Sequence, residues 1–200
     1  MSNESEQISL RKIRMQNIFD MGLGFTAMMR VFKQDSKSTL LKRLIHEEGK
    51  AILEVKSKEE FEKIHARFCD WGTKNISQAE KKRNGRIIKT EAQASYGQIA
   101  KTFDVTLKAA VYYSHLPDCE RAEQLSKWLY AAVDTQMMAK LAGYYPEAIG
   151  APWPTSVEGV DSAAKYLAIQ KVVRKFIEER HEGNITPVQF DDKYWDEWNP

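Results

Sequence analysis

The chain has 200 residues, of which 42% are hydrophobic and 29% are charged, and its formal net charge is +2. This length fits one domain, or one domain with an appendage, and a chain of this size buries about 70% of the surface that its unfolded form exposes. The composition is that of a soluble globular protein, and the net charge is too small to indicate a partner by itself. Two cysteines exclude a disulfide framework, so we expect reduced thiols and a cytoplasmic location.

The first seven residues are polar and acidic, and we expect residues 1–7 to be disordered. They lack the basic and apolar regions of a signal peptide. No apolar run in the chain approaches the ~18 residues of a membrane span. We therefore expect no membrane association.

A helical pattern runs from residue 8 to about residue 33, and Gly22 and Gly24 interrupt it. Each glycine costs roughly 1 kcal/mol in a helix interior, so we predict a break at 22–24. A second helix begins near residues 38–39. Residues 51–55 are short and apolar, which leaves strand and helix open.

Ser57 and Glu60 have the spacing of a capping box, and apolar residues behind them share one helix face. The pattern predicts a helix that runs on to a stop at Asn84-Gly85. Residues 86–89 are a candidate extended piece. Together with 51–55, they are the main place where we allow a short β-hairpin.

The stretch from 95 to 115 is the most patterned in the chain and has two interpretations. As one helix it presents a continuous apolar stripe of Tyr96, Ile99, Phe103, Leu107, Ala110 and Val111. As two short helices broken at 104–106, the segment 96–113 resembles a helix-turn-helix motif, and this resemblance implies that Thr106, Leu107, Lys108 and Tyr112 face the major groove of DNA. Asp104 stands where that motif usually has glycine, and Leu107 is a poor base reader. The pattern therefore favours one core helix.

After Pro117 the pattern predicts a helix from Asp118 to Gly143, a proline-rich loop over 144–154, and a long helix that ends near His181. The aromatic and acidic tail, 188–200, is expected to pack on the domain. The predicted fold is all-α, with a single compact helical domain (8–187) of five to seven helices.

A basic cluster precedes the central stretch, and Glu80 is the only acidic residue between positions 74 and 89. Its cations are Lys74, Lys81, Lys82, Arg83, Arg86 and Lys89. Such a patch suits phosphate, because neutralising phosphates releases counterions. The alternative is a solvated helix end, where cations favour the helix dipole. Our leading hypothesis is a non-enzymatic protein that binds DNA or RNA through Lys81, Lys82, Arg83, Arg86 and Lys89, together with Lys101 and Lys108.

Both cysteines follow a histidine by four residues, in the pairs His65/Cys69 and His115/Cys119. Residues four apart on a helix share a face, so each pair is a candidate edge of a tetrahedral zinc site. The spacing matches no zinc motif that we recognise. The default is therefore two cysteines that pack as small hydrophobic residues, with no bound metal.

The segment Arg174-Lys-Phe-Ile-Glu-Glu-Arg-His181 is similar to the Arg-x(4–6)-His motif of HEPN-type ribonucleases. This resemblance implies metal-independent RNA cleavage by Arg174 and His181, in a cleft that a homodimer usually forms. Lys175 departs from the small polar residue that the family often has there. The alternative is a charged helix C-terminus.

Residues Ser95-Tyr-Gly-Gln98, Lys101 and Leu107-Lys108, and more loosely 164–170, resemble a short signature of small bacterial helical proteins that are uncharacterised. This resemblance implies a bacterial or phage source and supplies no function. The chain has no glycine-rich phosphate loop, and we expect no cofactor. A third functional hypothesis is a structural or protein-binding module that uses the aromatic tail.

Overall fold

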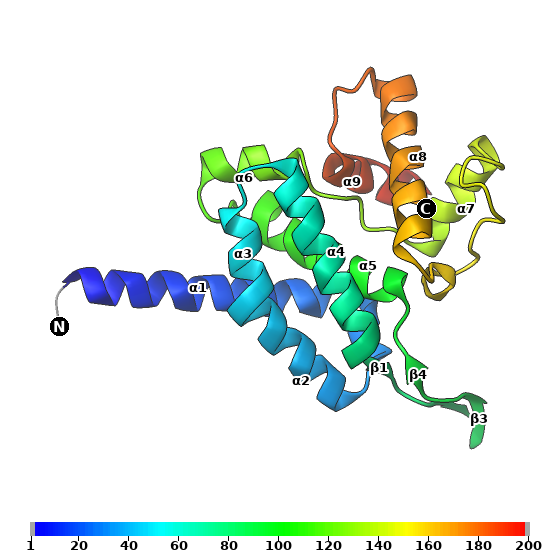
Figure 1. The fold of residues 1–200 in the computed structure, drawn as a ribbon, viewed down its shortest axis with the longest axis horizontal. Coiled ribbons are helices and arrows are strands. Elements are labelled where there is room, and N and C mark those ends of the chain that lie inside the picture. Colours follow the sequence, from blue (N-terminus) through cyan, green and yellow to red (C-terminus); the bar gives the residue numbers. More distant parts are fainter. Residues whose placement is uncertain (1–2, 199–200) are drawn as a thin grey trace.

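The computed structural model describes residues 3–198, so the expectations for residues 1–2 and 199–200 lie outside the described range. The α-helices are α1 (Asn3–Phe25), α2 (Gln34–Arg43), α3 (Gly49–Glu54), α4 (Lys58–Asn75), α5 (Tyr96–Leu107), α6 (Cys119–Ser126), α7 (Thr135–Tyr144), α8 (Ala163–His181) and α9 (Pro187–Trp198). Short 3-10 helices are η1 (Ala27–Arg30) and η4 (Val157–Gly159), and π-helical segments are η2 (Leu44–Glu48) and η3 (Lys108–Tyr113). The strands are β1 (Ser77–Gln78), β2 (Lys81–Arg83), β3 (Arg86–Lys89) and β4 (Ala92–Gln93). The all-α prediction is confirmed (Figure 1).

Helix α5 lies at the centre of the fold and contacts α1, α4 and α8. The predicted capping box is present, since the Ser95 side chain accepts from Gln98 N and the Gln98 side chain accepts from Ser95 N. The helix is continuous through Asp104, and η3 continues it to Tyr113. The two-helix alternative for 96–113 is therefore wrong. Asp104 is therefore a residue of the helix interior and not a turn residue, and its carboxylate is hydrogen-bonded inside the core.

Helix α1 also differs from its prediction. It has no break at 22–24, because Gly22 allows α1 to approach α5 closely: a Cβ built on Gly22 would lie 3.1 Å from the Cα of Thr106. The cost of glycine in the helix is thus offset by packing. Residues 3–7, expected to be disordered, form the first turns of α1. Extending a helix that is already nucleated adds one hydrogen bond for each residue fixed.

Residues 77–93 form an antiparallel ribbon and not the end of a helix. Strand β1 pairs with β4, and β2 pairs with β3. Asn84 and Gly85 have φ angles of 51° and 74° in the turn, which suits the Asn-Gly hairpin turn. The predicted helix to Gly85 is therefore wrong, since α4 ends at Asn75. The hairpin that we allowed with 51–55 is also wrong, because residues 49–54 form α3.

The predicted helix from 118 to 143 is interrupted. Helix α6 ends at Ser126 and α7 begins at Thr135, where the Asp134 side chain accepts from Met137 N at 2.8 Å. The connecting residues 129–134 are buried. The Gln170 side chain satisfies the backbone of Ala131 in this segment, because it donates to Ala131 O at 2.8 Å and accepts from Ala131 N at 3.2 Å.

The C-terminal tail forms α9, which lies beside α8 in Figure 1. Val188 and Phe190 of this helix are buried in the core. Asp191 makes an ion pair with Lys108 at the C-terminal side of the central helix. Among the described residues, we find no helix that combines the length and the apolar character needed to cross a membrane.

Candidate nucleic-acid interface

The basic cluster of the sequence forms a projecting β-ribbon. Figure 1 shows the ribbon leaving the helical body beside β1 and β4, with β3 at its far end. Lys81, Lys82, Arg83 and Arg86 are all exposed on this ribbon. Lys74 is also exposed, near the end of α4. The cations therefore project from two extended strands that are exposed to solvent on both faces.

The strand register places like charges opposite one another. Arg83 pairs with Arg86, and Lys81 pairs with Lys89. Directly opposed like charges destabilise an antiparallel pair. One carboxylate lies near these cations, because Lys82 Nζ is 3.0 Å from Glu80 Oε1. Within residues 3–198, no ion pair is found for Lys81, Arg83 or Arg86.

Lys89 has a different role from the other ribbon cations. Its ammonium donates to Gln78 Oε1 at 2.6 Å and makes a short ion pair with Glu158. The hydrogen bond from Lys89 lowers the pKa of the Glu158 carboxyl below its usual value. Lys89 therefore fixes the base of the ribbon to η4, and its charge is largely neutralised there.

The buried side chain of Gln78 joins the ribbon to the body. Its Oε1 accepts from Lys89 and from Gln98 Nε2, the latter at 3.1 Å. Its Nε2 donates to Gln93 O at 3.1 Å and to Glu158 Oε1 at 3.3 Å. Both donors and both acceptor positions of the amide are thus used. The base of the ribbon is therefore tied to the capping box of α5.

Backbone hydrogen bonds add a second attachment at the ribbon base. Lys33 N donates to Ser77 O at 2.9 Å, and Ala79 N donates to Val31 O at 2.8 Å. Residues 31–33 therefore pair with the start of the ribbon. Only the distal part, from about residue 81 to residue 88, projects without such support.

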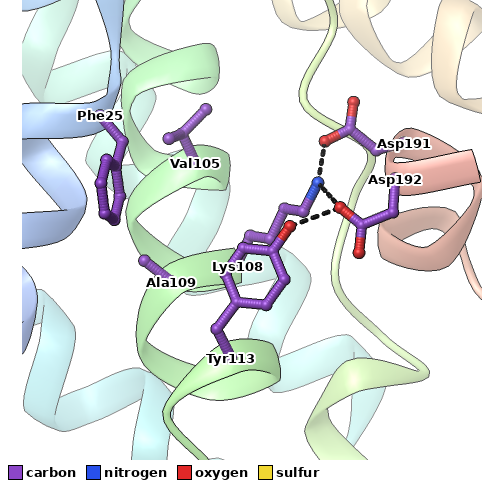
Figure 2. Close-up of a pocket in the computed structure, with 7 residues that line it drawn as sticks. All are labelled: Phe25, Val105, Lys108, Ala109, Tyr113, Asp191 and Asp192. Atoms are coloured by element: carbon purple, nitrogen blue, oxygen red, sulfur yellow. Dashed lines mark hydrogen bonds and ion pairs between the residues drawn. The ribbon is translucent and has the colours of Figure 1, made fainter. Parts of the chain in front are cut away.

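Two predicted contact residues, Lys101 and Lys108, are not available on the surface. The Lys101 side chain is 15% exposed, and its Nζ lies 3.7 Å from Asp134 Oδ2. Burial lowers the pKa of the Lys101 ammonium. The Lys108 side chain is 12% exposed. It lies between the carboxylates of Asp191 and Asp192, with both contacts at 2.6 Å (Figure 2).

The hollow around Lys108 has a volume of about 530 Å³. Phe25, Val105, Ala109 and Tyr113 complete its lining (Figure 2). The Tyr113 hydroxyl donates to Asp192, so the polar groups in this hollow already satisfy one another. Lys101 and Lys108 therefore do not lie with the exposed ribbon cations, because both are largely buried and paired with carboxylates.

A buried polar relay connects α4, α5 and α8. His65 Nε2 lies 2.9 Å from Asp104 Oδ1, and the Tyr166 hydroxyl donates to Asp104 Oδ2 at 2.6 Å. Cys69 Sγ lies 3.7 Å from His65 Nδ1. Burial raises the pKa of the Cys69 thiol, so the thiol keeps its proton.

The relay contains the atom types of a nucleophilic cysteine centre, but it has no access to a substrate. Cys69 and Tyr166 are 0% exposed, His65 is 1% exposed and Asp104 is 2% exposed. A catalytic nucleophile must reach a reacting atom within hydrogen-bonding range. We therefore assign the relay a structural role at the centre of the core.

The candidate metal ligands do not form a metal site. In the described part of the chain, no group of three or more His, Cys, Asp and Glu side chains is arranged to hold a metal ion. His65 and Cys69 belong to the buried relay. His115 and Cys119 instead line a separate cavity of about 480 Å³, and Cys119 is exposed. The zinc alternative therefore has no support in the geometry.

Arg174 and His181, the residues of the ribonuclease alternative, both lie on α8. Arg174 is half-buried, and one of its terminal nitrogens, Nη2, is enclosed and has no hydrogen-bond partner among the described residues. His181 Nε2 lies 2.6 Å from the hydroxyl of Tyr194 on α9. That nitrogen is therefore engaged with the C-terminal helix and does not face an open site.

We compared the chain with protein-family models, with curated proteins and with solved structures, and none of the three comparisons returned a match. The candidate interface therefore rests on the residues and their geometry. The sequence identified its cations correctly as a cluster. The hairpin itself had one signal in the sequence, Asn84-Gly85, which we interpreted as a helix stop.

Proposed function

We propose that this protein binds nucleic acid through the distal part of the ribbon, with Lys81, Lys82, Arg83 and Arg86 as the phosphate contacts. The observation that carries the proposal is the cross-strand register. Arg83 lies opposite Arg86 at the turn end of the ribbon. A polyanion would neutralise this repulsion, whereas a ribbon with only a structural role would be more stable without it.

The shape of the ribbon supports the same proposal. A two-stranded ribbon is one of the elements narrow enough to enter the major groove of B-form DNA. The four cations project from a support that is attached at its base through Gln78 and through residues 31–33. A rigid attachment lowers the entropy that is lost when side chains are ordered on a ligand.

The first test replaces the three cations of β2 with glutamate, in the variant K81E/K82E/R83E. Fluorescence anisotropy would follow binding to a labelled DNA duplex, an RNA duplex and a single strand. We expect the variant to lose about 100-fold in affinity, because each reversed charge removes about 1 kcal/mol of attraction near the surface. Wild-type binding should weaken with salt between about 50 and 200 mM, with a slope of about −3 to −4 in log K against log salt.

The matched control is K127E/K140E/K171E, which makes the same change in net charge at exposed lysines of the helical body. This variant should keep most of the wild-type affinity and its salt slope. Equal losses in the two variants would show that only overall charge matters. Wild-type protein that binds none of the probes at about 50 mM salt would end the proposal.

A further inference from the structure

The centre of the basic ribbon carries two apolar side chains that are about half exposed. Ile87 and Ile88 lie side by side in β3, and each is 53% exposed. Single exposed apolar residues are common on protein surfaces. Here two occur together, between Arg86 and Lys89, on the element that carries the cations.

The backbone at these residues is irregular. Lys82 pairs with Ile87 and Lys81 pairs with Lys89, so Ile88 is an extra residue that has no partner on β2. This is a β-bulge, which interrupts the alternation of side chains and changes the direction in which they point. The unpaired residue of the bulge, Ile88, is therefore adjacent to the other isoleucine of the ribbon, Ile87.

We propose that the ribbon binds double-stranded DNA and inserts the side chains of Ile87 and Ile88 at a base step, which kinks the duplex. This inference rests on the proposed function and names its substrate class. Isoleucine is among the apolar side chains that proteins insert between base steps, and the insertion partly unstacks the bases and bends the helix.

The positions of the cations fit such an insertion. Arg86 precedes the two isoleucines, and Lys82 lies opposite Ile87 across the ribbon. Residues in a strand advance by about 3.4 Å, which is also the axial spacing of phosphates along one DNA strand. Cations next to the apolar pair are therefore within reach of the phosphates on either side of an opened base step.

The ribbon base provides the rigid support that insertion requires. Side chains that act on a ligand must be held by packing and by surrounding hydrogen bonds. Gln78 is 1% exposed and joins the ribbon to α5 and η4. These hydrogen bonds therefore hold the distal ribbon in a fixed position relative to the helical body.

The choice of B-form DNA over RNA follows from groove geometry. The major groove of an RNA duplex is deep and narrow, and side chains cannot read it. The wide major groove of B-form DNA admits a two-stranded ribbon. An RNA duplex and single-stranded DNA are therefore the competing probes in the test.

The test uses the full chain and a DNA duplex of about 25 base pairs with a donor dye and an acceptor dye at its ends. Wild-type protein should increase energy transfer on binding, because bending brings the ends together. It should also bind a duplex with a central mismatch about 10-fold more tightly than the intact duplex, because a mismatched base costs less to unstack. The variant I87S/I88S should bind with the wild-type salt slope but lose both effects.

Two further variants serve as controls. I87V/I88V keeps an apolar, β-branched pair and should retain the bend and the mismatch preference. I13S/L167S removes two other exposed apolar side chains, on α1 and α8, and should behave as the wild type. Circular dichroism would confirm that each variant is folded.

The possible failures are distinguishable. Wild-type protein that binds no nucleic acid overturns the proposed function and this inference together. Salt-dependent binding of DNA without bending, or bending that I87S/I88S retains, overturns the inference and leaves the proposed function standing. Tighter binding of the RNA duplex or of the single strand overturns the assignment to double-stranded DNA.

Discussion

The protein places charged residues in two contrasting environments, the buried relay and the projecting ribbon. In the relay, Asp104 sits in a site that is 2% exposed, and two side chains bond its carboxylate. In the ribbon, arginines face each other across two strands and remain in water. Removing the partners of a buried charge lowers the free energy of unfolding strongly, whereas removing an exposed charge changes it little. The first region should therefore govern stability, and the second should govern binding.

The largest effect is expected from Asp104→Ala in the relay. This change leaves the polar atoms of His65 and Tyr166 buried without their shared acceptor. We expect a loss of about 3–5 kcal/mol in the free energy of unfolding. Urea denaturation followed by circular dichroism would measure it. Asp70→Ala changes an exposed aspartate of α4 and should cost less than about 0.5 kcal/mol. A small effect of Asp104→Ala would contradict a structural role for the relay.

A smaller loss is expected from Tyr166→Phe, which removes only the hydroxyl that donates to Asp104. The ring stays in place, but one carboxylate oxygen loses its donor, which should cost about 1–3 kcal/mol. The same denaturation experiment applies. Tyr144→Phe is the matched change on an exposed tyrosine and should be nearly neutral. If the two variants were equally stable, the bond between Tyr166 and Asp104 would contribute nothing to folding.

Glu158 at the ribbon base should give a pH-dependent effect that is smaller again, because this carboxyl is mostly solvated. Its pKa is lowered from 4.5, mainly by the hydrogen bond from Lys89. An acid whose pKa is lowered on folding stabilises the fold above the pKa of the unfolded state, and this contribution is lost as the pH falls through the folded pKa.

The measurement compares the wild type with Glu158→Gln in urea at several pH values. The variant should be less stable at neutral pH, and the difference should vanish as the pH falls below the folded pKa of Glu158. Glu147→Gln, at an exposed site, should show no such convergence. A difference that persists at low pH would show that the Glu158 charge does not hold the ribbon base.

The smallest effect on stability is expected from Arg83→Thr in the ribbon. Removing one of two opposed arginines relieves repulsion, so stability should stay the same or rise by up to about 0.5 kcal/mol. Affinity for nucleic acid should fall in the same variant. A loss of more than about 1 kcal/mol in the unfolding experiment would instead show that Arg83 supports the fold.

Helical periodicity carried much of the fold prediction, because a buried helix shows its apolar stripe in the sequence. Helix α5 is an example, with Ile99, Phe103 and Leu107 buried on one continuous element. Two interruptions were mispredicted for a shared reason. Helix α1 continues through Gly22 because Thr106 lies against this glycine. The helix predicted from 118 to 143 is interrupted at 129–134, where the Gln170 side chain bonds the backbone of Ala131. In both cases the deciding contact is distant in the sequence.

The candidate site could be predicted only in part. The cations of the ribbon are local in sequence, so their clustering was visible. Their β conformation depends on the Asn84-Gly85 turn, in a segment with little apolar alternation to reveal strands. The burial of Lys108 was not visible in the sequence, because its carboxylate partners, Asp191 and Asp192, lie more than 80 residues further along the chain.

The bonding of Gln78 also has a consequence for protein synthesis. Its amide requires Gln98, which is 20 residues away, and Glu158, which is 80 residues away. Contacts between distant residues form late, because loop-closure entropy must be overcome first. The β2–β3 hairpin ends at Lys89, so all of its residues are synthesised before Glu158. At that stage the hairpin therefore lacks the bonds from Glu158 to Gln78 and Lys89. The later addition of η4, which contains Glu158, completes the attachment of the ribbon base.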